Sequence, residues 1–112
     1  MKKLLIILFT FLIIACSTAP TFHAATIKTP TTQCGMCKQA IESSLSCIKG
    51  VNSVTVDLIN YQTVIKYNPN RISLTDLELV ISKSGYHANQ VEADSIAYRN
   101  LHICCRLPND RN

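Results

Sequence analysis

Two cysteines stand three positions apart in the segment Cys34-Gly35-Met36-Cys37, where an extended stretch gives way to a predicted helix. A turn of this kind brings the two thiols together, and the positive partial charge of a helix N-terminus favours loss of their protons. Such a pair of thiols can capture a soft metal ion, or it can exchange a disulfide with another dithiol. The rest of the sequence must discriminate between metal capture and redox exchange.

The remaining cysteines do not form a typical disulfide framework. Setting Cys16 aside leaves five of the six cysteines, an odd number, and Cys104 and Cys105 are adjacent. Neighbouring cysteines do not easily bond to each other without backbone strain. Our hypothesis is that Cys104 or Cys105 supplies an additional metal ligand or a transfer relay, and the alternative is a disulfide to Cys47 or between molecules. For Cys47, late in the predicted helix, we expect a small buried side chain.

Two histidines and one lysine are further candidates near these cysteines. His87 and His102 offer imidazole nitrogens that could bind a metal ion. We interpret His87 as a surface or packing residue, and His102, two residues before Cys104, is the more interesting of the two. Lys38 directly follows the first cysteine pair, where it either offsets thiolate charge or simply lies on a solvated helix face.

The N-terminal residues 1–16 are typical of an export signal. Lys2-Lys3 is followed by an apolar run that ends at Ala15 and is shorter than the roughly 20 residues of a membrane span. The end of this run, Ile13-Ile14-Ala15-Cys16, resembles the lipobox of bacterial lipoproteins. That resemblance implies cleavage before Cys16 and a lipid attached to it.

This interpretation predicts a lipoprotein exported to the bacterial cell envelope, anchored in a membrane by its lipid and facing the periplasm. An ordinary signal peptide cut near Ala24-Ala25 is the alternative, although His23 is unfavourable for that cut. Loss of Lys2-Lys3 lowers the formal charge from +4 to +2, because nine basic residues then remain against seven acidic ones. Without a run of Lys or Arg, so mild a charge gives no indication of nucleic-acid binding.

The length allows one small domain, preceded by a polar tether at residues 17–23. Hydrophobic periodicity predicts strands and helices in alternation. Ser73 with Asp76 predicts a capping box at the start of the second helix, and Gly85 ends that helix. The expected strands are 24–32, 54–58, 62–67 and 86–91, and the expected helices are 37–49 and 73–84.

The order strand-helix-strand-strand-helix-strand is typical of the ferredoxin-like sandwich, an α+β fold. In that fold, both helices pack on one face of a four-stranded antiparallel sheet. Residues 93–103 predict a further short helix with Asp94 as a cap, so that residues 93–112 form a C-terminal tail. This tail carries the Cys104-Cys105 pair and is long enough to turn back toward the first pair.

Several short motifs follow one another along residues 24–92. They are Cys34-x-x-Cys37, Ile48-Lys49-Gly50-Val51, Val54-x-Val56, Tyr67-Asn68-Pro69 and Ser84-Gly85-Tyr86. Together they resemble the heavy-metal-associated domain family, which includes small copper chaperones, the periplasmic mercury-binding protein and soluble domains of metal-pumping P-type ATPases. The resemblance covers roughly residues 24–92 and implies a ferredoxin-like fold.

Carried over to this sequence, the resemblance implies that Cys34 and Cys37 are the two metal thiolates and that Tyr86 approaches the site. One departure affects the loop. Where the family usually has a Met two positions before the first cysteine, this chain has Thr32, and its Met36 lies between the cysteines. The rigidity of the loop, and with it the metal preference, is therefore open.

Two thiolates on an exposed loop favour soft ions, with Cu(I) our first choice and Hg(II) our second. Zn(II) prefers four ligands and fits less well. We therefore predict a monomeric protein that is not an enzyme and that exchanges its ion with a metal-transporting membrane protein or another metallochaperone.

Two alternatives to this metal carrier are kept. One is a dithiol oxidoreductase, because Cys-Gly-x-Cys is superficially similar to the thioredoxin motif; against it, Met36 replaces the Pro of that motif and the chain contains no Trp. The other is a lipoprotein adaptor that binds no metal and has all its cysteines in disulfides.

Overall fold

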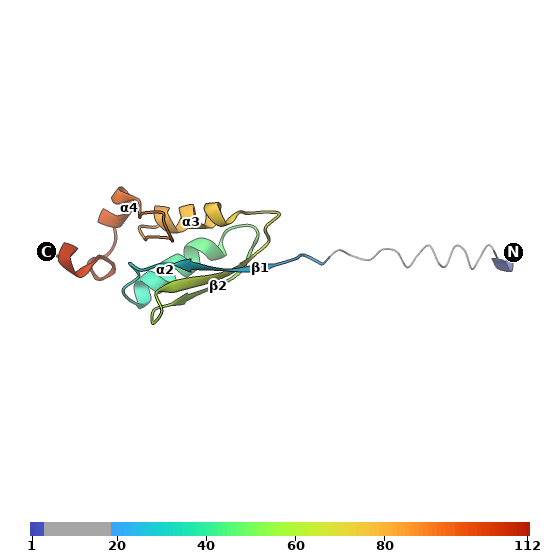
Figure 1. The fold of residues 1–112 in the computed structure, drawn as a ribbon, viewed down its shortest axis with the longest axis horizontal. Coiled ribbons are helices and arrows are strands. Elements are labelled where there is room, and N and C mark those ends of the chain that lie inside the picture. The colour runs from blue at the N-terminus through green and yellow to red at the C-terminus, as the bar shows by residue number, and fades with distance from the viewer. Residues whose placement is uncertain (4–18) are drawn as a thin grey trace.

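The computed structural model describes residues 1–3 and 19–112, and the predicted lipobox with Cys16 lies outside them. Figure 1 shows the folded part, with the C-terminal tail at the end opposite the N-terminus. Within the described residues, no helix has the length and apolar character needed to cross a membrane. The elements are β1 (His23–Lys28), α2 (Gly35–Ser46), β2 (Val51–Asp57), β3 (Gln62–Tyr67), α3 (Leu74–Lys83) and α4 (Ser95–Arg99).

The three strands form an antiparallel sheet in the order β1-β3-β2. The period-2 pattern predicted β2 and β3, because alternate side chains point toward the helices. The first strand, expected at residues 24–32, ends at Lys28. The sheet and the helices α2 and α3 enclose one hydrophobic core, as expected for an α+β sandwich of the ferredoxin type. Its fully buried aliphatic residues are Ile27, Val56 and Ile65 from the strands and Ile41, Leu45, Leu77 and Ile81 from the helices.

The predicted fourth strand at residues 86–91 is wrong. Asn89 has a positive φ of 53° and allows a tight turn, in which Ala88 and Val91 bond to each other through both backbone N–H groups at 2.9 Å. The turn uses the backbone N–H and C=O groups of Ala88 and Val91, which would otherwise pair with a neighbouring strand. Contact with β1 is limited to Asn89, whose N–H donates to the Lys28 carbonyl at 2.9 Å and whose Oδ1 accepts from the Lys28 N–H at 2.8 Å.

The helix boundaries follow local capping chemistry. The capping box of α3 is present as predicted: Ser73 Oγ accepts from the Asp76 N–H at 3.1 Å, and the Asp76 carboxylate accepts from the Ser73 N–H at 3.2 Å. Gly85 follows α3 with a φ of +99°, a conformation that glycine adopts without a steric penalty. Helix α2 starts at Gly35 and ends at Ser46, three residues before the expected end.

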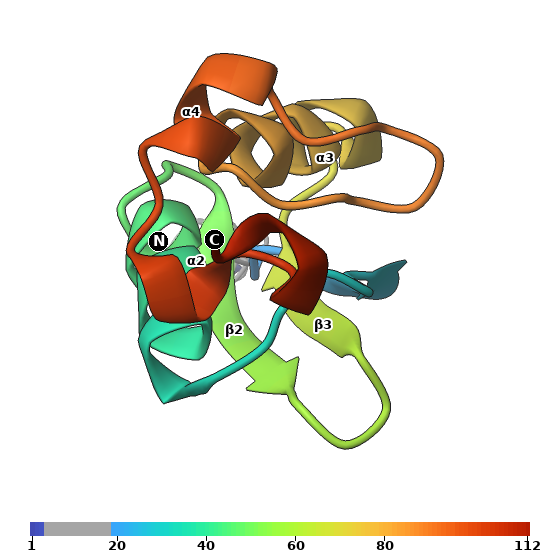
Figure 2. The same cartoon turned by 90° about the vertical axis from the view of Figure 1, so that its left-hand side faces the viewer.

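The tail contains a shorter helix than predicted, followed by two 3-10 turns. Asp94 caps α4 as expected, because its Oδ1 accepts from the N–H groups of Ile96 and Ala97. After α4 come the turns η2 (Ile103–Cys105) and η3 (Pro108–Asp110). Figure 2 shows that this segment turns back over the N-terminal end of α2, beneath α4.

Candidate metal centre

The first cysteine pair lies at the N-terminus of α2. Cys34 is the N-cap residue with extended backbone angles (φ −151°, ψ 175°), and Cys37 belongs to the first turn. The change from extended to helical backbone brings their sulfur atoms to 3.3 Å from each other. Cys34 is half-buried, whereas Cys37 is completely buried in the core. The pair therefore reaches solvent through Cys34.

The tail brings two more thiols to the same place. Cys34 Sγ lies 3.5 Å from Cys104 Sγ and 3.8 Å from Cys105 Sγ, and the two tail sulfurs are 3.9 Å apart. All three of these sulfurs lie within 4.8 Å of one another. Cys34 thus contacts three other thiols, one from its own helix and two from about 70 residues further along the chain.

Hydrogen bonds within the tail order the η2 turn that carries the two cysteines. The Tyr98 hydroxyl donates to Asp110 at 2.7 Å and accepts from the Leu107 N–H at 2.9 Å. Arg111 Nη2 donates to the Cys104 carbonyl at 3.2 Å, and Arg106 Nη2 donates to the Arg99 carbonyl at 2.7 Å. These bonds connect η2 to α4 on one side and to the C-terminus on the other.

The surroundings favour ionisation of one thiol of the cluster. Burial opposes the charge on Cys34. Its effect is outweighed by hydrogen bonds from the N–H and thiol of Cys37 and from the thiols of Cys104 and Cys105, which lower the pKa of Cys34 from 9.0 to about 7. The pKa of Cys105 is raised, first by burial and then by the neighbouring Cys37 thiol. The pKa of Cys104 is also raised, first by its contact with Cys34 and then by burial. The cluster therefore concentrates its negative charge on Cys34.

Tyr86 faces this cluster from beneath. Its side chain is completely buried, and its hydroxyl has no hydrogen-bond partner among the described residues. The pKa of Tyr86 is raised well above its ordinary value, first by burial and then by the nearby Cys105 and Cys37 thiols. A buried hydroxyl without a partner is costly. The nearby Cys105 and Cys37 sulfurs would become good acceptors once they are deprotonated.

The other candidate residues have different surroundings. Lys38 Nζ lies 3.8 Å from Glu42 Oε1 on a partly exposed helix face. Cys47 is exposed at the C-cap of α2, so the expectation of a buried side chain is wrong; the helix ends one residue earlier and turns Cys47 outward. His87 is half-buried; its backbone N–H donates to Thr31 Oγ1, and its Nδ1 has no hydrogen-bond partner among the described residues.

Three residues of the loop and the tail have neighbours that the sequence alone did not reveal. Thr32, at the family's Met position, is buried with its hydroxyl lacking a partner among the described residues. Met36 instead points its Sδ at Cys104 Sγ, 3.6 Å away, and His102 Nδ1 lies 3.3 Å from the same sulfur. The sequence feature that could have indicated the contact between Met36 and Cys104 is the apolar Met36 between two cysteines. No periodic pattern fixes where the tail lies.

A donor set made of thiols has a narrow chemistry. Thiolates select Cu(I), Hg(II) and, when four are available, Zn(II), whereas hard ions need oxygen ligands. Sulfur atoms that share one trigonal or tetrahedral ion through bonds of about 2.3 Å stand about 3.7–4 Å apart. The separations of 3.3–3.9 Å around Cys34 need only small adjustments to match.

Comparison with known proteins gives consistent matches. The family profile of the heavy-metal-associated domain matches residues 26–87, more than half of the chain. The copper chaperone CopZ of Staphylococcus aureus (strain JH9) is 38% identical over 53 residues, which are 47% of this chain and 78% of that protein.

Solved structures agree with these sequence matches. A CopZ metallochaperone is 30% identical, with a TM-score of 0.58 over 59% of this chain and 98% of that one. The N-terminal domain of a potential copper-translocating P-type ATPase from Bacillus subtilis, in the Cu(I)-loaded state, is 25% identical; its TM-score is 0.59 over 67% of this chain and 99% of that one.

Proposed function

Since the chain belongs to the heavy-metal-associated domain family, we propose that it holds a soft metal ion at Cys34 and Cys37 and hands it to a partner protein. The family is one of metal carriers and not of enzymes, so the chain is not a dithiol oxidoreductase. The observation that carries the proposal is the contact of Cys34 Sγ with three other thiols, at the end of the domain where the family's metal motif lies.

Cu(I) is the ion we assign first. Cu(I) accepts two or three soft ligands, so Cys34 and Cys37 suffice for it and either tail thiol can join. The relatives named copper chaperones support this choice. Hg(II) is our second choice because it also binds two thiolates, and Zn(II) is third because it would need all four cysteines.

Cys104 and Cys105 give the carrier a closed form. With the tail in place, a bound ion at Cys34 would be covered by two additional sulfurs and shielded from solvent. Transfer to a partner then requires an incoming thiol to replace a tail thiol before the ion leaves Cys34. Tyr86 supports the bound form, because its hydroxyl gains thiolate acceptors that it lacks in the metal-free protein.

The partner we propose is a metal-transporting membrane protein, since the fold is similar to an N-terminal domain of a P-type ATPase. The lipobox resemblance at Cys16 supports export and lipid anchoring of this carrier in the cell envelope. Anchoring would keep the domain at the membrane surface, where such a transporter resides. Another metallochaperone is the second type of partner.

A metal titration under anaerobic, reducing conditions tests the proposal. Cu(I) is delivered from a chromogenic chelator to the wild-type chain and to Cys34→Ser and Cys37→Ser variants. We expect tight uptake by the wild type and a loss of affinity of at least about tenfold in each variant. Cys47→Ser is the matched control, because Cys47 is exposed and outside the cluster. Equal affinity in wild type and Cys34→Ser would contradict the proposal.

A further inference from the structure

Cys104 also has two soft neighbours that are not thiols. Met36 Sδ lies 3.6 Å from Cys104 Sγ, and His102 Nδ1 lies 3.3 Å from it. Cys34 Sγ is 3.5 Å away. The Cys104 sulfur is thus close both to other thiols and to the thioether of Met36 and the imidazole of His102, which we call the outer pair.

The outer pair is accessible to solvent. Met36 is 53% exposed although it is a large apolar residue, and His102 is exposed as well. Cys105, the neighbour of Cys104 in sequence, is only 3% exposed. An ion that arrives from solution would therefore meet Met36, His102 and Cys104 before it could reach Cys37 or Cys105.

Both outer donors are held in position by the backbone. Met36 belongs to the first turn of α2, between the two cysteines of the motif. His102 is the N-cap of η2, where its Nδ1 accepts from the Cys104 N–H at 3.4 Å. This bond is long, so a metal ion could replace it at Nδ1 at little cost and without moving the ring.

We propose that Met36, His102 and Cys104 form a second Cu(I) position on the solvent side of the centre, sharing the Cys104 sulfur with the inner thiols. Thioether, thiolate and imidazole together suit Cu(I), whereas a divalent soft ion such as Hg(II) gains more from a second thiolate. Donors that share one ion through bonds of about 2.0–2.3 Å stand about 3.3–4 Å apart, which the separations from Cys104 match.

This inference rests on the proposed function and makes it more specific. The outer position would receive Cu(I) from solution or present it to an incoming partner, and the shared sulfur would pass it to or from the inner thiols. Binding there displaces the Cys104 thiol proton to solvent. The copper stays Cu(I) throughout, so no oxidant or reductant is needed.

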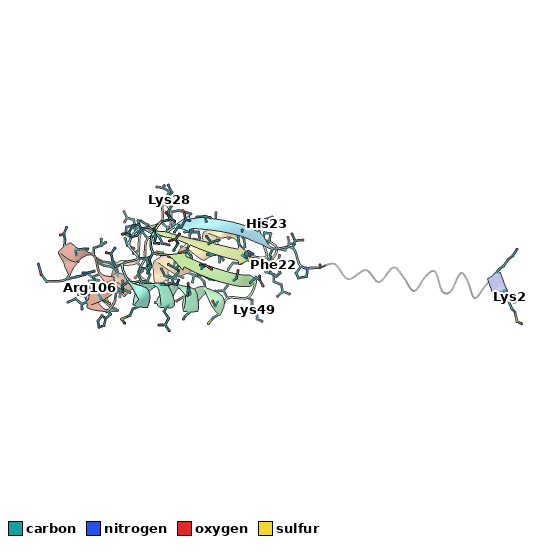
Figure 3. The ribbon with its side chains drawn as sticks, turned by 90° about the horizontal axis from the view of Figure 1, so that it is seen from below. Lys2, Phe22, His23, Lys28, Lys49 and Arg106 are labelled. Carbon is teal, nitrogen blue, oxygen red and sulfur yellow. The ribbon has the colours of Figure 1, made fainter. Side chains whose placement is uncertain are left out.

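The test is the number of Cu(I) ions bound by the reduced full-length chain, titrated anaerobically against a chromogenic chelator. The informative variant is Met36→Leu/His102→Asn, which removes both outer donors but keeps an apolar side chain and a capping acceptor. His23→Asn is the matched control, since His23 lies at the opposite end of the fold from Arg106 of the tail (Figure 3). We expect a second ion in the wild type and the control, and only the first in the double variant.

Ag(I), a diamagnetic soft probe, gives an independent readout. As its second equivalent is added, the methyl resonance of Met36 and the imidazole resonances of His102 should shift. An unchanged second binding step in the double variant, or saturation of the wild type after one ion, would overturn the outer position. Absence of any Cu(I) uptake by the wild type would instead refute the proposed function, so the two failures are distinguishable.

Discussion

Cys34 is the residue on which the chemistry of the centre is concentrated. It contacts Cys37, Cys104 and Cys105, and its position as the N-cap of α2 places it where partial positive charge is available. The consequence is an unequal cluster, in which Cys34 ionises early while Cys104 and Cys105 keep their protons until a metal ion displaces them. Above neutral pH, metal binding should accordingly release a proton from each tail thiol that joins the ion, and few protons from Cys34.

The pH dependence of thiol alkylation tests this inequality. In the metal-free reduced protein, Cys34 should react with iodoacetamide with a midpoint at about pH 7, because only the thiolate is nucleophilic. Its folded pKa lies below the unfolded value of 9.0, so its ionisation stabilises the fold above pH 9.0 and that contribution is lost as the pH falls through 7. Peptide mass spectrometry identifies the modified residue, and a Cys34 midpoint close to 9.0 would contradict the arrangement.

The Tyr86→Phe substitution should affect the metal-free and the metal-bound protein differently. The substitution removes a buried hydroxyl that has no partner among the described residues, so the metal-free variant should be as stable as wild type or more stable by about 1 kcal/mol. Cu(I) affinity should fall, because the thiolates lose a donor. Thermal unfolding with and without Cu(I) measures both effects. A less stable metal-free variant would show that the hydroxyl is already satisfied.

Among the helices and strands, the sequence correctly predicted those features that depend on local interactions. The β3 strand was predicted with its observed bounds from its alternation, and the α3 capping box followed from Ser73 and Asp76. The fourth strand was predicted wrongly because the fold depends there on Asn89, whose positive φ forms a tight turn between Ala88 and Val91 in place of a strand. Composition gives little warning of such a conformation at a single asparagine.

The centre was predicted only in part, for a similar reason. The Cys34 and Cys37 sulfurs meet because a helix turn places them together, which their spacing shows directly. The approach of Cys104 depends instead on long-range tail contacts such as the Tyr98–Asp110 hydrogen bond. The sequence permitted the tail to return but did not indicate that Met36 would meet it.

Gly85 couples helix α3 to the tail. A Cβ at this position would lie 3.0 Å from Leu101 Cδ2 and 3.2 Å from the Ala97 backbone, and φ is +99°. Gly85→Ala should therefore reduce the free energy of unfolding by about 1–3 kcal/mol. It should also loosen the tail, so that Cys105 reacts faster with alkylating reagents. Urea unfolding and mass spectrometry of Cys105 measure the two effects.

Gly35→Ala provides the matched control for that substitution. A Cβ on Gly35 would meet no atom within 4 Å, and the residue starts α2. The variant should be as stable as wild type or gain up to about 1 kcal/mol, since alanine restricts the unfolded chain. If both variants lost equal stability, the contact between Gly85 and Leu101 would not be what holds the tail.

In the whole molecule, the tail and the N-terminal residues occupy opposite ends. Phe22, His23 and Lys49 lie at the end that continues toward the N-terminus, and Arg106 lies at the other end with the cysteines (Figure 3). A tether at the first end would leave the sulfur cluster directed away from the point of attachment. This arrangement suits a carrier that must present its ion to a separate protein.

X-ray absorption spectroscopy of the chain loaded with one equivalent of Cu(I) tests the central claim most directly. We expect a first shell of sulfur atoms only, including at least one from the tail, so that the number of sulfur scatterers falls in Cys104→Ser/Cys105→Ser. In Cys34→Ser, the all-sulfur shell should be lost. A nitrogen or oxygen shell in the wild type that is unchanged by Cys34→Ser would contradict the claim.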